Sequence, residues 1–255
     1  MASPILEARN AHKSYGHVRS LQGANLQVFP AEVVALIGDN GAGKSTLTKA
    51  LSGVISIDAG ETLVDGNPVT FHSPQDAREH GIETVYQDLA LALDLSPTEN
   101  VYLGREIRAP GIWGRLGFLD RRTMLRETER RFEELGVKLR ETHGAVANLS
   151  GGQRQGVAVA RALIWAKRVV FMDEPTAALG VAQTRNVLSL IRRVRDQGVS
   201  VVLISHSMPD VLAVSDRIVV LRHGATVARF NTREARSDDL VAAMTGSLQT
   251  EGASE

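Results

Sequence analysis

Residues 38–46, GDNGAGKST, match the spacing G-x-x-x-x-G-K-[ST] of a phosphate-binding loop. In such a loop the glycines let the backbone curl, so that successive N–H groups point toward phosphate oxygens. The lysine reaches the β- and γ-phosphates, and the hydroxyl of the serine after it binds Mg²⁺. The alternative is a glycine-rich turn with an incidental lysine. The predicted nucleotide contacts are Gly38, Asp39, Asn40, Gly41, Ala42, Gly43, Lys44, Ser45 and Thr46, with Ser45 also a metal ligand.

A pair of acids, Asp173 and Glu174, ends the apolar run VVFMDE. If residues 169–172 form a buried strand, both carboxylates lie at its carboxyl end, where ligands bind in open α/β sheets. We expect Asp173 to hold Mg²⁺ through water and Glu174 to take a proton from an attacking water. Two charges that end a strand are by themselves more often structural, so the catalytic interpretation depends on the phosphate-binding loop.

A second helix start suited to anions lies in ANLSGGQRQGVAVARALI, residues 147–164. Ser150 can cap the helix, and Gly151 and Gly152 let its first backbone N–H groups approach a phosphate closely. An ordinary serine-capped helix would explain Ser150 but not the second glycine together with Gln153. Two anion sites that open separate helices of one rigid core cannot both reach one nucleotide, whereas two chains can bring them together.

The elements around these motifs alternate along the chain. In the N-terminal third, ILEARNAHKSYG and LQGANLQVF alternate apolar and polar residues, as half-buried antiparallel strands do. The runs at 33–37, 168–174 and 200–206 are mostly apolar, as in strands covered on both faces, and helical segments separate them. One helix, at 182–198, spaces its apolar residues three or four apart: Val187, Leu190, Ile191 and Val194. The pattern predicts an α/β fold with a largely parallel sheet and helices on both faces.

Residues 89–159 interrupt this alternation, because no buried strand is visible there. The segment 120–136 reads as an amphipathic helix with a charged, solvated face and an apolar stripe made of Met124, Leu125, Thr128, Phe132 and Leu135. We therefore predict a core of residues 1–88 and 160–245, a helical subdomain inserted at 89–159, and a disordered tail at 246–255.

GDNGAGKST, LSGGQ (149–153) and VVFMDEPTAAL (169–179), in this order, resemble the motifs of the ATP-binding subunit of an ABC transporter. The resemblance implies a P-loop NTPase of the ABC ATPase type, with an N-terminal antiparallel β subdomain, a RecA-like parallel-sheet core and an inserted helical subdomain. It implies ATP and Mg²⁺ as cofactors. It also implies a head-to-tail dimer, in which each nucleotide contacts the P-loop of one copy and the signature helix of the other, through Ser150, Gly151, Gly152 and Gln153.

Three further residues match motifs of the family one by one: Tyr15, Gln87 and His206. The resemblance implies that Tyr15 stacks on adenine, that Gln87 senses Mg²⁺ and the attacking water, and that His206 hydrogen-bonds the γ-phosphate. Without it, Tyr15 would be a packing residue, Gln87 a polar loop residue and His206 a structural histidine. The chain departs from the family at Gly180, where an aspartate commonly follows Ala-Leu and helps to couple the two sites.

The segments LSPTENVYLGREI (95–107) and GFLDRRTM (117–124) resemble the helical region of monosaccharide importers of the ribose, xylose, galactose and fructose type. The resemblance implies import of a monosaccharide, with fructose as one candidate, through separate permease subunits at the cytoplasmic face of the membrane. A periplasmic or extracellular sugar-binding protein would be an indirect partner. Many relatives carry two ATPase modules, so a chain with one P-loop and one signature would act as a homodimer.

Composition argues against several other classes. Lysine plus arginine and aspartate plus glutamate both number 29, so no basic field indicates a nucleic-acid partner. There is no cysteine, and no apolar run approaches the roughly 20 residues of a membrane span. A P-loop GTPase should show an Asn-Lys-x-Asp motif, and the sequence has none. A soluble ABC ATPase, or an importer ATPase for another small solute, stays as an alternative.

Overall fold

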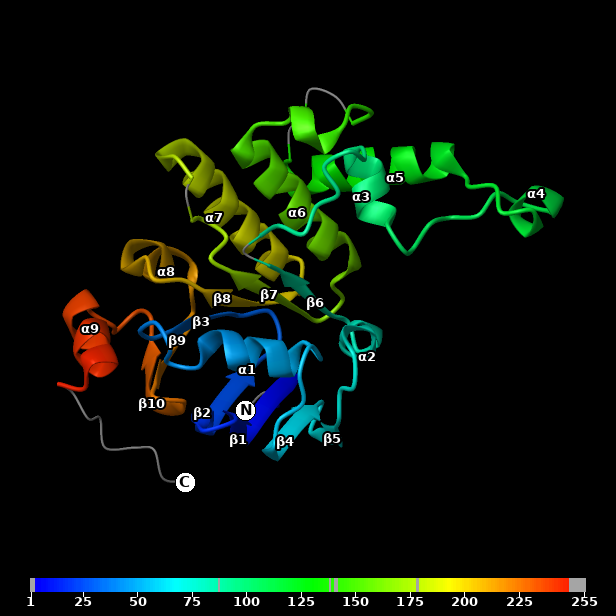
Figure 1. Cartoon of the computed structure of the whole chain (residues 1–255). Coiled ribbons are helices and arrows are strands. Elements are labelled where there is room, and N and C mark those ends of the chain that lie inside the picture. Colours follow the sequence, from blue (N-terminus) through cyan, green and yellow to red (C-terminus); the bar gives the residue numbers. More distant parts are fainter. Residues whose placement is uncertain (1–2, 87, 138, 140–141, 178, 248–255) are drawn as a thin grey trace.

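The computed structural model describes residues 3–86, 88–137, 139, 142–177 and 179–247, which form two sheets with helices around them (Figure 1). The first sheet has the strand order β2-β1-β4-β5: Val18–Val28, Leu6–Tyr15, Ala59–Val64 and Asn67–Val69. Its strand pairs are antiparallel, which confirms the expectation from the alternating N-terminal pattern.

The second sheet has the order β10-β9-β3-β8-β7-β6: Ala225–Asn231, Arg217–Arg222, Val33–Ile37, Ser200–Ile204, Val169–Asp173 and Ile82–Val85. The strands from β9 to β6 are parallel, and β10 is antiparallel to β9. Every residue of β3 and of β8 is buried, as expected for strands covered on both faces. The carboxyl ends of the parallel strands therefore share one edge of the sheet, and the loops that follow β3, β7 and β8 meet there.

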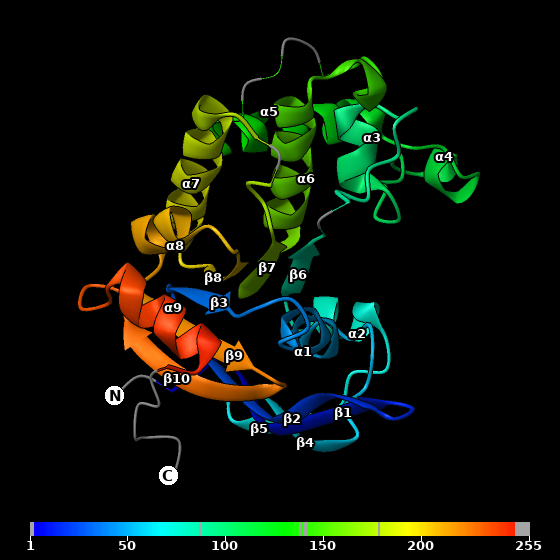
Figure 2. The same cartoon turned by 60° about the vertical axis from the view of Figure 1, so that its left-hand side comes forward.

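Helices cover both faces of this sheet (Figures 1 and 2). Between the two sheets lies α1 (Lys44–Leu51), which packs Leu47 and Leu51 into a core shared with β1, β2 and β3. The long helices α6 (Gly151–Trp165) and α7 (Val181–Asp196) cover the other face, and the four residues predicted for the apolar stripe of α7 are buried. The shorter helix α2 (Pro74–Glu79) packs on the edge strand β6 and α9 (Ser237–Thr245) packs on β9, whereas α8 (Met208–Val214) packs against α7.

The insertion contributes α3 (Pro97–Tyr102), α4 (Ile112–Arg115), α5 (Arg121–Leu135) and a short 3₁₀ helix at Val146–Asn148. Of the stripe predicted for α5, four residues are buried and Leu125 is partly exposed. The boundary predicted between residues 159 and 160 falls inside α6, so one continuous helix joins the insertion to the core. Residues 248–255 of the predicted tail lie outside the described residues.

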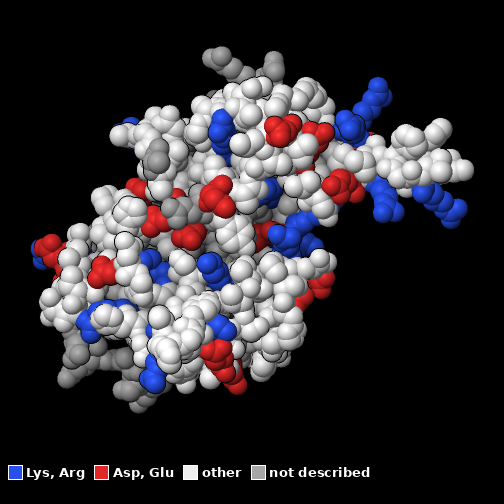
Figure 3. Space-filling view, viewed as in Figure 1, with Lys and Arg blue, Asp and Glu red and all other residues white. Residues whose placement is uncertain are grey.

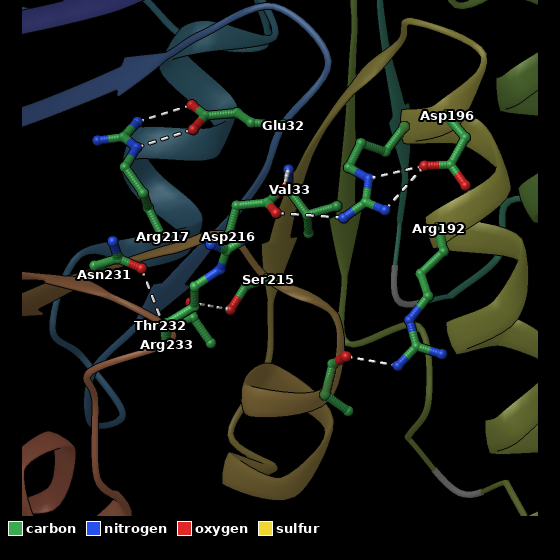
Figure 4. A network of polar contacts seen from close by, with 12 residues as sticks. Glu32, Val33, Arg192, Asp196, Ser215, Asp216, Arg217, Asn231, Thr232 and Arg233 are labelled. Carbon is green, nitrogen blue, oxygen red and sulfur yellow. Dashed lines mark hydrogen bonds and ion pairs between the residues drawn. The ribbon is translucent and has the colours of Figure 1, made fainter.

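A network of charged side chains fixes where β3 and β9 begin (Figure 4). Arg217 donates two hydrogen bonds to the carboxylate of Glu32, from Nε (2.9 Å) and Nη2 (2.8 Å). Asp216 accepts a hydrogen bond from the backbone N–H of Val33 (2.8 Å) and another from Arg195 Nη1 (3.3 Å), which ties in the last turn of α7. Because these contacts lie at the amino ends of the strands, they hold the register that aligns the opposite, carboxyl ends.

The described helices include none with both the length and the apolar composition needed to cross a lipid bilayer.

Candidate nucleotide-binding and catalytic site

The loop at residues 38–43 connects buried β3 to α1 and has a conformation that requires glycine at two points. Gly38 has φ 152°, and a Cβ there would collide with the carbonyl oxygen of Leu221 on β9. Gly43 has φ 102°, and a Cβ would lie 2.7 Å from the carbonyl oxygen of Ser20 on β2. Both positions are therefore closed to larger residues, and the loop curls between the two sheets as the phosphate-binding interpretation predicts.

Lys44, the first residue of α1, lies back across this loop. Its Nζ donates to the carbonyl oxygens of Gly38 (2.7 Å) and Asp39 (2.9 Å). Burial lowers the pKa of Lys44, while the carboxylates of Glu174, Asp173 and Asp39 act in the opposite direction. The site thus holds a half-buried ammonium group that has lost much of its water, and phosphate oxygens can replace its two carbonyl acceptors.

The two hydroxyls after Lys44 have different surroundings. Thr46 Oγ1 lies 2.6 Å from Ser20 Oγ, so it is hydrogen-bonded within the fold. Ser45 is exposed at the start of α1. A hydroxyl there together with a carboxylate at the end of β7 suits Mg²⁺, which usually keeps waters and phosphate oxygens in its coordination shell and takes few protein ligands. Ser45 and Asp173 therefore fit the ion. Within the described ranges no group of three or more His, Asp or Glu side chains forms a separate metal cluster.

Asp173 and Glu174 lie at the carboxyl end of β7 as predicted, and the backbone turns sharply between them. Glu174 has φ 50°, a conformation rare for residues other than glycine, and its N–H donates to the carbonyl oxygen of Ile204 on β8 (2.9 Å). Burial raises the pKa of Asp173, the negative charge of Glu174 raises it further, and Lys44 acts in the opposite direction. A residue with a strained backbone, such as Glu174, is found more often at functional sites than elsewhere.

The structure brings His206 directly to Glu174. His206 follows β8, and its Nδ1 lies 2.8 Å from Glu174 Oε2. The Glu174 side chain is 15% exposed and the His206 side chain 76% exposed, so a largely exposed histidine contacts a mostly buried carboxylate. The two residues were predicted for the same reaction from separate motifs, and the parallel pairing of Asp173 with Ile204 explains why they meet.

Tyr15 ends β1, and its side chain is largely exposed, with 49% of the residue accessible. It pairs with Val18 in the hairpin to β2, two residues from Ser20, which contacts the phosphate-binding loop. Lys13 Nζ lies 5.9 Å from the centre of the tyrosine ring. The ring is therefore outside the core, as stacking on a base requires.

The second helix start has the geometry of a complete capping box. Ser150 caps α6: its Oγ accepts a hydrogen bond from Gln153 N (3.3 Å), and Gln153 Oε1 accepts one from Ser150 N (2.9 Å). A Cβ at Gly151 would meet no atom within 4 Å, whereas one at Gly152 would lie 2.7 Å from Gln183 Cγ on α7. The face of α6 at Gly151 is thus open to an approaching group.

Figures 1 and 2 show that α6 begins at the end of the helical region remote from the sheet and runs toward β7, whereas α1 lies on the other side of the sheet. One chain therefore brings together the residues from β3, α1, β7 and β8 but does not place Ser150, Gly151, Gly152 and Gln153 beside them. Gln87 lies outside the described residues. So does Ala178, two residues before Gly180, the position at which the chain departs from the family. Gly180 itself is the N-cap of α7, and a Cβ there would lie 2.7 Å from Gln183 Oε1.

The residue that sequence reasoning missed is Arg161, in the middle of α6. Its Nη1 donates to the carbonyl oxygen of Ala90 (2.6 Å), and its Nη2 donates to that of Leu89 (3.1 Å). Both of these residues have positive φ, 44° and 61°, and burial lowers the pKa of the arginine. Arg161 thus ties the helix that begins at Ser150 to the loop that follows β6. The available signal in the sequence was an arginine within the apolar run VAVARALIW.

A buried strand, a glycine loop around a lysine, and an acidic pair on a parallel strand of the same sheet define a P-loop nucleoside triphosphatase. The family model described as ABC transporter matches residues 21–177. The chain belongs to this family, and it is the ATPase of an ABC transporter.

Relatives match along nearly the whole chain. The chain is similar to the fructose import ATP-binding protein FrcA of Rhizobium meliloti, with 50% identity covering 96% of this chain and 95% of the relative. Identity to the xylose/arabinose import ATP-binding protein XylG of Sulfolobus acidocaldarius is 42%, covering 95% and 94%. Identity to the ribose import ATP-binding protein RbsA 1 of Streptomyces coelicolor is also 42%, but the chain spans 47% of that relative.

Solved structures agree on the fold. The chain superposes on a nucleotide-free ATP-binding cassette from an ABC transporter with a TM-score of 0.78, 24% identity and 95% coverage of both chains. A dimeric structure of a bacterial ABC transporter cassette gives a TM-score of 0.76 at 22% identity, covering 90% of this chain and all of the other. These matches confirm the predicted fold: a P-loop NTPase with an antiparallel β subdomain, a parallel-sheet core and an inserted helical region.

Proposed function

We propose that two copies of this chain form a head-to-tail dimer that hydrolyses Mg²⁺-bound ATP and drives import of a monosaccharide through separate permease subunits. The dimer would work at the cytoplasmic face of the cell membrane, as a peripheral subunit, with a sugar-binding protein on the other side. The observation that carries the proposal is the 50% identity to a fructose import ATP-binding protein over nearly the full length of both chains. Fructose is accordingly the first sugar to test.

In the proposed mechanism, the backbone N–H groups of residues 38–46 and the Lys44 ammonium bind the β- and γ-phosphates. Mg²⁺, held by Ser45 and by Asp173 through water and sensed by Gln87, would neutralise charge on the phosphates. Glu174 accepts the proton of the attacking water. His206 would hydrogen-bond the γ-phosphate while its Nδ1 stays against Glu174, which would link the position of the base to the presence of that phosphate.

The partner copy completes the site in this mechanism. The first N–H groups of an α-helix lack intrahelical acceptors and favour anions. Closure of the dimer would bring the start of α6 of the partner, with Ser150, Gly151, Gly152 and Gln153, to the γ-phosphate. The separation of α6 and α1 within one chain supports a site in which the two helices come from different copies. Tyr15 would stack on the adenine of the same nucleotide.

A mixing experiment tests the dimer. Lys44→Ala removes the phosphate-binding lysine, and Gly151→Asp puts a negative charge at the start of α6, where a Cβ meets no neighbour and an acid is favourable to the helix. Each variant alone should hydrolyse ATP poorly. In an equal mixture, the mixed dimers have one site with both motifs intact, so activity should rise to about a quarter of wild type by random pairing.

Gly151→Ala, which adds the Cβ without the charge, separates the steric from the electrostatic effect and should lose less activity than Gly151→Asp. Full activity of Gly151→Asp alone would contradict the shared site. So would a mixture that is no more active than its two components and stays monomeric with ATP by light scattering.

The imported solute is tested by co-expressing the chain with its permease and measuring ATP hydrolysis and uptake in membrane vesicles. Sugar-binding protein loaded with fructose should stimulate both, and the same protein loaded with ribose or xylose reports which monosaccharide is preferred. Stimulation by a non-sugar solute alone would exclude sugar import. ATP hydrolysis that never responds to a permease would favour a soluble ABC ATPase that acts elsewhere.

A further inference from the structure

Residues 103–120, which we call the arm, leave the helical region between α3 and α5 and project away from the rest of the molecule, with α4 near the tip (Figures 1 and 2). The arm exposes large apolar side chains: Ile112 is 67% exposed, Trp113 59%, Leu116 65% and Phe118 56%. Exposed apolar side chains gathered in one place usually mark a surface that binds a partner.

The arm has internal structure of its own. Arg108 and Leu119 form an antiparallel bridge, and Ala109 N donates to the carbonyl oxygen of Phe118 (2.8 Å). The rings of Trp113 and Phe118 meet edge to face, with centroids 5.5 Å apart and planes at 87°. The apolar side chains are therefore presented by a closed hairpin with α4 in its turn.

The charges of the outer part of the arm, residues 107–119, are of one sign, and the acidic residues Glu106 and Asp120 lie at its base. Residues 107–119 contain Arg108 and Arg115 and no aspartate or glutamate, and Arg121 and Arg122 follow at its base. On the face shown in Figure 3, the far part of the arm carries only basic and uncharged residues, whereas acidic residues lie nearer the body of the molecule. The partner of the arm should therefore be negatively charged as well as apolar.

An anionic lipid leaflet satisfies both requirements. Tryptophan and other large apolar side chains settle at the boundary between headgroups and acyl chains, while arginines remain among the anionic headgroups. A narrow projection with apolar side chains at its end can enter a lipid surface without a matching groove, whereas a protein partner would have to supply one.

We propose that the arm inserts Ile112, Trp113, Leu116 and Phe118 into the headgroup region of an anionic membrane, with Arg108 and Arg115 on the lipid phosphates. The contact would hold the ATPase against the membrane beside its permease. This inference rests on the proposed function, because it adds a lipid partner to the proposed peripheral location.

Flotation with vesicles tests the contact without any permease. The wild-type chain should float with vesicles of equimolar phosphatidylcholine and phosphatidylglycerol, and should stay mostly unbound with pure phosphatidylcholine. The pair Ile112→Ser and Leu116→Ser, which leaves the Trp113–Phe118 contact in place, should weaken binding roughly tenfold or more, as should Arg108→Gln with Arg115→Gln.

Matched controls lie elsewhere on the surface. Val54→Ser with Val241→Ser changes two other exposed apolar residues, and Arg229→Gln with Arg233→Gln changes two exposed arginines on and after β10. Both pairs should bind vesicles like the wild type. All of these variants should retain basal ATP hydrolysis, which shows that they are folded.

Tryptophan fluorescence gives a second readout, because the chain has only two tryptophans. Trp165 packs against Tyr102 and donates from Nε1 to the carbonyl oxygen of Val101 (2.9 Å), so Trp165→Phe leaves Trp113 as the reporter. Its emission should shift to the blue with anionic vesicles and be quenched by brominated lipid.

Three outcomes would overturn the inference: no binding of the wild type, equal binding of arm and control variants, or no spectral shift of Trp113. Capture of the permease in detergent that only the arm variants lose, without vesicle binding, would also overturn it in favour of a protein contact. Any of these results with normal ATP hydrolysis and sugar uptake leaves the proposed function intact.

Discussion

Glu174→Gln should lower ATP turnover about 10²–10⁴-fold, the contribution typical of a general base, while ATP binding and the ATP-dependent dimer persist. The substitution replaces one carboxylate oxygen by an amide nitrogen and removes the proton acceptor. The backbone at residue 174 is held by its N–H bond to Ile204, which the side-chain change does not touch. The variant should therefore fold, bind ATP, and remain closed because hydrolysis no longer reopens it.

Asp210→Asn is the matched control for this experiment. Asp210 lines the same hollow as Glu174 and His206, and its Oδ2 accepts a hydrogen bond from Thr176 (2.8 Å), which an amide oxygen can also accept. Its turnover should stay near wild type. Single-turnover hydrolysis, ATP binding and light scattering together separate loss of chemistry from loss of binding. Near-normal turnover of Glu174→Gln would remove this residue from the mechanism.

Local patterns predicted most of the backbone geometry around the candidate site. The loop between β3 and α1 depends on glycines and an adjacent buried strand, and the cap of α6 depends on Ser150 and Gln153, three residues apart. Both are short-range arrangements whose geometry follows from residue type and spacing. The acidic pair at the end of β7 follows in the same way, because a continuous apolar run predicts a buried strand and hence the place where the next charged residues emerge.

Contacts between distant segments could not be predicted in this way. Arg161 reaches the carbonyl oxygens of Leu89 and Ala90, more than 70 residues earlier, and only the packing of α6 against β6 brings them together. The Glu174–His206 contact likewise depends on the register of β7 and β8. For the arm, apolar residues such as Trp113 carry the same sequence signal whether they are buried or exposed, and only the fold shows that they are exposed.

Lys44→Ala should weaken ATP binding roughly 10- to 150-fold, the range expected when a hydrogen-bonded charge is lost. In the structure the ammonium group is half buried and its acceptors are the carbonyl oxygens of Gly38 and Asp39. The ammonium group has therefore already lost much of its water on folding. Replacing its two neutral carbonyl acceptors by charged phosphate oxygens is then strongly favourable. Alanine removes that gain, and calorimetric titration with a non-hydrolysable ATP analogue measures the loss.

Lys49→Ala, an exposed lysine in the last turn of the same helix, is the control and should bind the analogue like the wild type. The protonated lysine is the form that binds phosphate, and burial lowers the pKa of Lys44. Wild-type affinity should therefore begin to fall with rising pH below the range in which an ordinary lysine titrates, and Lys44→Ala should lose this component of the pH dependence. If Lys44→Ala binds the analogue as tightly as Lys49→Ala does, residues 38–46 are not the phosphate site.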